Sequence, residues 1–139
     1  MIAFDADILS DLFRGLPEYV RRAEAIPADQ HSLPVVVVEE ILRGRLNEIR
    51  RAEAGKSRIS IERAYDLFQE TVAYLRQFRI LPYASDAERL YQGWRAPRLR
   101  VGTHDLRIAA ICVAHSATLV SRNRRDFELV PGLAVEFWD

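Results

Sequence analysis

Acidic side chains stand at several points where one predicted element of the chain gives way to the next. Asp5 ends the apolar run IAF, Glu39 and Glu40 follow VVVV, and Asp105 lies in the first turn of THDLRIAAICVAH. An unpaired buried carboxylate is costly, so a chain retains one only where a cation, a helix N-terminus or hydrogen bonds offset that cost. These residue types therefore predict either helix caps or the ligands of a cation.

A fourth junction carries an amide and an acid, because Asn123 and Asp126 follow the run ATLVS. Singly, each acid has an ordinary role, since aspartates cap helices and acids in a first turn stabilise the helix dipole. Together, four such junctions at one edge of a sheet would concentrate negative charge that a cation relieves. Oxygen ligands favour Mg²⁺ or Mn²⁺ over zinc, and the histidines lack metal-ligand spacing, although His104 adjoins Asp105.

The elements that must position these residues alternate between strand and helix. The expected strands are IAFD (2–5), LPVVVV (33–38), RILPYA (79–84), ATLVS (117–121) and LAVEFW (133–138). Helical patterns cover 8–15, 17–26, 39–54, 59–78, 86–94 and 104–115, the last capped by Thr103. This alternation predicts an α/β fold in three layers, a parallel sheet of four to five strands with helices on both faces. Ligands of such folds collect at the carboxyl ends of the strands.

Length and composition narrow the classes of protein. The 139 residues, 49% of them hydrophobic, predict one domain over 1–139. The single cysteine, Cys112, excludes a disulfide framework, and no apolar run approaches the roughly 20 residues that span a bilayer. We therefore expect a soluble, cytoplasmic protein. Its 20 basic and 20 acidic side chains cancel, so any nucleic-acid contact must be local.

Three stretches of the chain carry a resemblance to a known family. They are FDADILSDL, VVVVEEILRGRL and VGTHDLRIAAICVAHSATLVSRNRRDFELVPGLAVEFW, which cover both ends and the middle. The last is the most specific, with G-T-x-D-x-x-I-A-A followed by S-R-N-x-x-D-F. The sequence resembles PIN-domain ribonucleases, specifically the VapC type of bacterial toxin. The resemblance implies a single PIN-like domain of three layers over 1–139.

The resemblance also implies a metal site. The family's first, second and third acids fall on Asp5, Glu40 and Asp105, which would bind Mg²⁺ or Mn²⁺. Helical periodicity alone leaves Glu39 and Glu40 open, because Glu39 lies nearer the apolar face of its helix. The family's glutamate stands four residues before a glycine, here Gly44, and this spacing selects Glu40.

Further site residues are implied beside these acids. Asn123 occupies the family's fourth acidic position, with Asp126 three residues on as a substitute. Asp7 and Ser121 would orient the metal ligands. Ala6 stands where the family usually has threonine, so a hydroxyl that orients the first acid or a water is missing. Both departures leave fewer groups to bind or orient a metal ion.

The implied activity is hydrolysis of RNA phosphodiester bonds by an endoribonuclease toxin. The resemblance also implies a cognate antitoxin that neutralises the toxin, and a homodimer, for which the apolar residues of 17–26 and 64–75 offer surface. Arg43 and Arg45 would meet the antitoxin tail. The RNA phosphates would be met by five arginines in polar segments predicted as loops: Arg98, Arg100, Arg122, Arg124 and Arg125.

Two alternatives stay open. Ala6 and Asn123 favour a PIN-like binding module with weak or no catalysis. A receiver-like or phosphatase-like α/β domain would use one acid as a phospho-acceptor and would require a lysine near the site. The only lysine, Lys56, falls in a loop between two predicted helices, which disfavours that second alternative.

Overall fold

A five-stranded parallel sheet forms the centre of the computed structural model, which describes residues 1–95 and 99–139. Its strand order is β3-β2-β1-β4-β5, and every neighbouring pair is parallel. The strands are β1 (Ile2–Phe4), β2 (His31–Pro34), β3 (Arg79–Leu81), β4 (Thr118–Ser121) and β5 (Val135–Phe137). The predicted α/β class and parallel sheet are confirmed.

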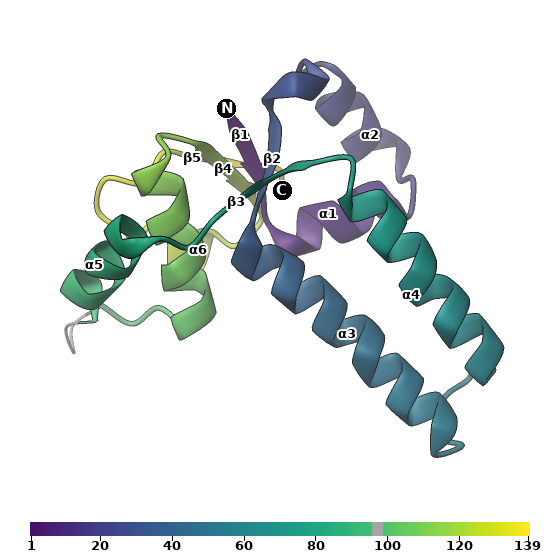
Figure 1. Cartoon of the computed structure of the whole chain (residues 1–139). Helices are drawn as coiled ribbons and strands as arrows, with labels where there is room; N and C mark the ends of the chain where they lie inside the picture. Colours follow the sequence, from purple (N-terminus) through teal and green to yellow (C-terminus); the bar gives the residue numbers. More distant parts are fainter. Residues whose placement is uncertain (96–98) are drawn as a thin grey trace.

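Helices cover both faces of this sheet, which confirms the predicted three layers. Figure 1 shows α1 to α4 on one side of the strands and α5 and α6 on the other. In the described residues the helices are α1 (Ala6–Phe13), α2 (Pro17–Glu24), α3 (Val35–Glu53), α4 (Ile61–Leu75), α5 (Ser85–Trp94), α6 (Thr103–Ala114) and α7 (Arg124–Phe127), with a 3₁₀ turn at Ala28–Gln30. As its apolar sequence predicts, α6 packs in the core, with half of its residues buried.

The strand order places a topological switch point beside β1. The chain moves from β1 outward to β2 and β3, and then returns past β1 to form β4 on its other side. In parallel sheets the loops at such a point diverge and leave a crevice at the carboxyl ends of the strands. Asp5 follows β1 and Ser121 ends β4, so both lie at this crevice.

The predicted strand over LPVVVV is largely wrong. Strand β2 covers His31–Pro34, and the four valines form the first turn of α3 instead. Pro34 caps that helix, where its missing N–H group costs nothing, and a short apolar run cannot distinguish a strand from a buried helix turn. Val36 and Val37 pack into the core, which overrides the strand preference of β-branched residues. Consequently Glu39 and Glu40 lie one turn inside α3 rather than at a strand end.

The caps of two site-bearing helices also differ from expectation. Gly102, not Thr103, is the N-cap of α6, and Thr103 is the first helical residue. The segment after β4, predicted as a loop, contains the short helix α7, which begins because the Asn123 side chain accepts a hydrogen bond from the Asp126 backbone N–H.

Two further sequence predictions concern the core and the membrane. Cys112 is buried, and burial raises the pKa of its thiol to about 12, as befits a structural cysteine. None of the helices in the described ranges has the length and apolar character needed to traverse a bilayer.

Candidate active site

Asp5 is the buried carboxylate at the centre of the site. It follows β1 and caps α1, and its side chain accepts hydrogen bonds from the Ala6 backbone N–H (2.8 Å) and the Ser121 hydroxyl (2.6 Å). Only 6% of the residue is exposed. Burial raises its pKa above the usual value, although the hydrogen bond from Ser121 opposes that shift. The folded chain therefore holds Asp5 where its negative charge is disfavoured.

Asp105 faces Asp5 from the first turn of α6. Burial, followed by the negative charges of Asp5 and Asp126, raises the pKa of Asp105 to about 7. These effects require the three carboxylates, which are distant in sequence, to lie close together in the fold. The predicted convergence of acids at one edge of the sheet is therefore present in the structure.

Asn123 links two of these acids through its side-chain amide. Its Nδ2 lies 3.2 Å from an Asp105 oxygen and 3.0 Å from an Asp126 oxygen, and donates a hydrogen bond to each. An ionised aspartate at this position could not donate and would add a further negative charge. The amide that departs from the acidic pattern thus relieves repulsion inside the cluster.

Glu40 is the glutamate of α3 that faces the acids. Burial, followed by the charges of Asp5 and Glu39, raises the pKa of Glu40. Glu39 instead bonds Arg43 one turn further along α3. Glu40 rather than Glu39 therefore lies in the electrostatic field of the acids, and it stays the predicted site glutamate.

His104 lies against both glutamates, a contact that sequence reasoning did not identify. Its Nε2 is 3.4 Å from a Glu39 oxygen, and its Nδ1 is 3.9 Å from a Glu40 oxygen. The signal was its position beside Asp105, because the first turn of α6 faces the acids. A single histidine without metal-ligand spacing was not enough to predict these contacts from the sequence.

Asp7 and Asp11 lie on α1 beyond Asp5. Asp7 accepts a hydrogen bond from the Ile8 backbone N–H (2.7 Å), and its Oδ2 is 3.7 Å from Arg122 Nε. Asp11 was not singled out from the sequence, yet it is almost fully buried and bonds both Arg14 and Arg122. Its signal was an acid on the apolar face of α1, three residues after Ile8.

The arginines predicted to meet RNA occupy different surroundings. Arg122 bonds Asp11, and Arg124 pairs with Asp139 and Glu128. Arg100 and Arg125 are exposed. Arg98 lies outside the described residues.

The acidic cluster offers two carboxylates, not a closed set of ligands, to a divalent ion. Within residues 1–95 and 99–139, no three acidic, histidine or cysteine side chains are arranged to enclose a metal by themselves. Mg²⁺ commonly takes one or two carboxylates and completes its shell with water. Asp5 and Asp105 supply such a pair. Burial is the largest cause of the raised pKa values of Asp5, Glu40 and Asp105, and neighbouring carboxylates add to each shift, so a bound cation would stabilise the ionised forms. The chemistry of the cluster fits a hydrated Mg²⁺ or Mn²⁺.

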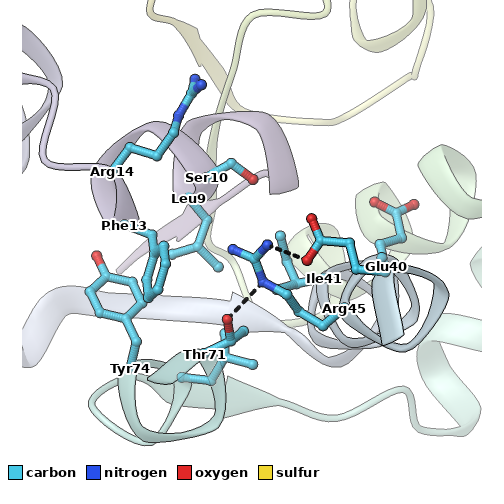
Figure 2. Close-up of a pocket in the computed structure, with 12 residues that line it drawn as sticks. Leu9, Ser10, Phe13, Arg14, Glu40, Ile41, Arg45, Thr71 and Tyr74 are labelled. Atoms are coloured by element: carbon cyan, nitrogen blue, oxygen red, sulfur yellow. Dashed lines mark hydrogen bonds and ion pairs between the residues drawn. The ribbon is translucent and has the colours of Figure 1, made fainter. Parts of the chain in front are cut away.

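A groove of about 460 Å³ begins at Glu40 and runs between α1, α3 and α4. Its walls are apolar at Leu9 and Phe13. Figure 2 shows the Arg45 guanidinium extending into this groove, where its Nε donates to the Thr71 hydroxyl (2.9 Å). Glu40 therefore joins the acidic cluster to a groove that is partly apolar and contains the Arg45 guanidinium.

Sequence comparisons relate the chain to one family. A family model described as PIN domain matches residues 2–133. Ribonuclease VapC2 of Rickettsia felis is 44% identical over 41 residues, which cover 30% of this chain and 31% of that protein. Ribonuclease VapC1 of the same organism is 34% identical over 62 residues, covering 42% of this chain and 46% of that protein. The matched segments span less than half of each relative.

Solved structures share the fold over nearly the whole chain. VapBC2 from Rickettsia felis, bound to a DNA fragment from its promoter, superposes with a TM-score of 0.77 at 23% identity and 100% coverage of both chains. A toxin-antitoxin complex from Klebsiella pneumoniae gives 0.72 at 25% identity, covering 96% of each chain. FitAcB from Neisseria gonorrhoeae gives 0.79 at 21% identity, covering 97% of this chain and 96% of that one. These likenesses extend to the strands and helices that carry the acids.

Proposed function

Since the chain belongs to the PIN-domain family and is related to VapC ribonuclease toxins, we propose that it is a divalent-metal-dependent endoribonuclease toxin. The observation that carries the proposal is the convergence of Asp5, Glu40 and Asp105, whose pKa values are raised first by burial and then by the charges of nearby carboxylates. An acidic cluster at the switch point of a parallel sheet suits the binding of a cation and a phosphate. We treat residues 1–139 as one catalytic domain.

In this proposal each side chain has a defined task. Asp5 and Asp105 bind Mg²⁺ or Mn²⁺, and Glu40 completes the acidic set through water. Asn123 and Asp126 orient waters around the site. A divalent ion bound there supplies Lewis-acid polarisation of the phosphate and a lower pKa for the attacking water.

The remaining residues hold these groups in place. Ser121 orients Asp5 through the hydroxyl that donates to it, and the Asn123 amide fixes Asp105. Asp7 adds negative charge beside Asp5. Arg100 and Arg125 are exposed and available to flanking RNA phosphates, whereas Arg122 and Arg124, also exposed, pair with acids of the chain.

The proposed protein partner is a cognate antitoxin that covers the site. The structural neighbours from Klebsiella pneumoniae and Rickettsia felis are a toxin-antitoxin complex and a VapBC complex, which supports a partner of this kind. The groove beside Glu40 suits an apolar segment with charged ends, because Leu9 and Phe13 lie next to Arg45. The gene immediately upstream identifies the partner if it encodes a small DNA-binding protein that binds this chain and suppresses its toxicity.

We also propose a homodimer. Tyr65 and Val72 are exposed on α4, with 53% and 37% of their surface accessible, and α2 buries Ala23 alone. Pairing through these helices would remove apolar surface from water. Light scattering at tens of micromolar, without antitoxin, is expected to give twice the chain mass, and a monomeric mass contradicts the dimer.

The central test is metal dependence. Purified protein is incubated with RNA in Mg²⁺, in Mn²⁺ or in EDTA, and Mn²⁺ binding is followed by calorimetry. Cleavage is expected only with a divalent ion. Asp66→Asn, an exposed acid of α4, serves as the control and is expected to behave like the parent. Cleavage that persists in EDTA, or the absence of Mn²⁺ binding, contradicts the proposal.

A non-catalytic binding module is the second candidate, and Ala6 is the observation that favours it. With alanine rather than threonine directly after Asp5, the first acid depends on the Ser121 hydroxyl and the Ala6 backbone N–H for orientation. A chain that binds its antitoxin but neither binds Mn²⁺ nor cleaves RNA would support this second candidate.

A further inference from the structure

Arg122 stands between the two residues that hold the acidic cluster. On one side of it, the Ser121 hydroxyl donates to Asp5, and on the other the Asn123 amide donates to Asp105. The Asn123 backbone N–H also donates to the Ser121 hydroxyl, at 3.0 Å. Any shift of this three-residue segment would therefore move the partners of both acids at once.

The Arg122 side chain reaches α1 and α2 rather than the acids of α6 and α7. Its Nη1 bonds Asp11 and donates to the Tyr19 hydroxyl (3.2 Å), and its guanidinium lies 5.5 Å from the centre of the Tyr19 ring. Asp11 is only 1% exposed, so this bond is anchored in the core on the Asp11 side. A buried carboxylate with two arginine partners is a fixed point, because moving either arginine leaves one buried carboxylate oxygen without its partner.

Asp11 also connects this bond to the residue that begins the site. Asp5 caps the N-terminus of α1, and Asp11 lies on the same helix, within its eight residues. The bond from Arg122 to Asp11 and the bond from Ser121 to Asp5 therefore tie one segment to one helix at two separate points. Two such attachments fix both the position and the tilt of the segment relative to α1.

We propose that Arg122 is a positioning residue: through Asp11 it holds Ser121 and Asn123 in the places from which they orient Asp5 and Asp105. The proposal rests on the proposed function in so far as the acids bind a divalent cation. It also removes Arg122 from the arginines available to RNA phosphates, since its guanidinium is engaged by Asp11 and Tyr19.

Charge and positioning predict opposite effects on metal binding. Arg122 is a cation near the acids, so its charge alone opposes a bound divalent ion, and its removal would tighten binding. If Arg122 instead positions the ligands, its removal loosens them and weakens binding. Loss of an interaction that orients metal ligands typically costs about 10-fold to 100-fold in affinity.

The first measurement is Mn²⁺ affinity by calorimetry for the parent, Arg122→Gln and Arg124→Gln. Arg124 is the matched control, because it lies two residues away and removes the same charge, but it pairs with Asp139 and Glu128. Arg122→Gln is expected to weaken Mn²⁺ binding about 10-fold or more, and Arg124→Gln to leave it unchanged or slightly tighter. Unchanged or tighter binding in Arg122→Gln overturns the proposal, even if its Tm falls.

A second measurement does not require a metal. Amide hydrogen exchange reports the Asn123 and Asp126 N–H groups, which donate to Ser121 Oγ and Asn123 Oδ1. In Arg122→Gln both are expected to exchange faster, while amides in the buried centre of α6 keep the parent rate. If the parent chain itself fails to bind Mn²⁺, the proposed function loses its metal, and these exchange rates alone decide whether Arg122 anchors the segment.

A double variant and a conservative variant complete the test. In Asp11→Asn/Arg122→Gln the two amides can bond each other without charge, so part of the lost Mn²⁺ affinity is expected to return. Additive losses would instead show that the two residues act separately. If Arg122→Gln does not fold, Arg122→Lys is measured in its place, because lysine keeps the charge but lacks the planar fork. Parent-like Mn²⁺ affinity and exchange in the folded lysine variant overturn the proposal.

Discussion

The N-cap of α1 and the helix itself each carry a buried aspartate, and these two residues have opposite surroundings. Asp11 bonds two arginines, Arg14 and Arg122, so its charge is balanced within the chain. Asp5 receives hydrogen bonds from Ser121 and Ala6, while its neighbours in the cluster are other acids. The chain could supply arginine to both, since 19 of its residues are arginines. The difference shows that the charge of Asp11 is balanced within the fold, and it supports the proposal that Asp5 binds a cation.

The largest effect is expected when the charge at Asp5 or at Asp105 is removed, which tests whether these acids are metal ligands. Asp5→Asn and Asp105→Asn are each expected to lower divalent-dependent RNA cleavage by at least about 100-fold while leaving the fold intact, because a metal ligand is lost. Gel analysis of RNA fragments, with circular dichroism as the control for folding, measures both effects. Cleavage at the parent rate in either variant would contradict the assignment.

The same change at Asp11 is expected to act on stability. Asp11→Ala should lower the free energy of unfolding by about 3 kcal/mol, because it removes the shared partner of two arginines and leaves a gap in the core. Urea denaturation measures this loss, and Asp66→Ala, an exposed acid of α4, provides the control. A loss no greater than that of the control would show that the buried ion pairs contribute little.

The raised pKa of Asp105 makes the free energy of unfolding depend on pH. Its pKa is raised to about 7 in the fold, so the folded state holds the proton more tightly than the unfolded state does. The resulting stability is present below about pH 4 and is lost as the pH rises through 7. In EDTA, Asp105→Asn should therefore gain about 2 kcal/mol over the parent at pH 8 and much less at pH 5. Urea denaturation at both pH values measures the difference, and an equal gain at both would refute this origin.

Ala6 offers the smallest expected change. Ala6→Thr restores a hydroxyl beside Asp5 and is expected to tighten Mn²⁺ binding or raise the cleavage rate about 10-fold, as an added hydrogen bond to a metal ligand does. Asp7→Asn, measured in parallel, tests whether Asp7 already supplies that support. If neither variant changes Mn²⁺ affinity or cleavage, the end of β1 is not a tuned metal site, and the binding-module alternative gains support.

Much of the fold and the location of the site could be predicted from the sequence. Alternation of strands and helices predicts a parallel sheet, and parallel strands bring their carboxyl ends to one edge. Asp5 reaches this edge because it follows β1, and Asp105 reaches it because the helix that leads into β4 begins at the same edge, although the two acids are 100 positions apart. Their selection as site residues came from the family resemblance. The predicted strand over the four valines was wrong. β-branched residues favour strands, but here the valines begin α3, and two of them pack into the core from that helix.

The sequence by itself determined which residue types reach the switch point, because chain order and strand direction decide where each strand ends. Only the tertiary structure decided how those residues are partnered. The face of α3 that packs inward turns Glu40 toward the acids, while Arg43 engages Glu39. Arg122 was predicted to meet RNA, but in the structure it bonds Asp11. The two residues are 111 positions apart and meet because α1 packs beside β4. Side-chain partnership is a property of three-dimensional packing, and no local pattern in the chain encodes it.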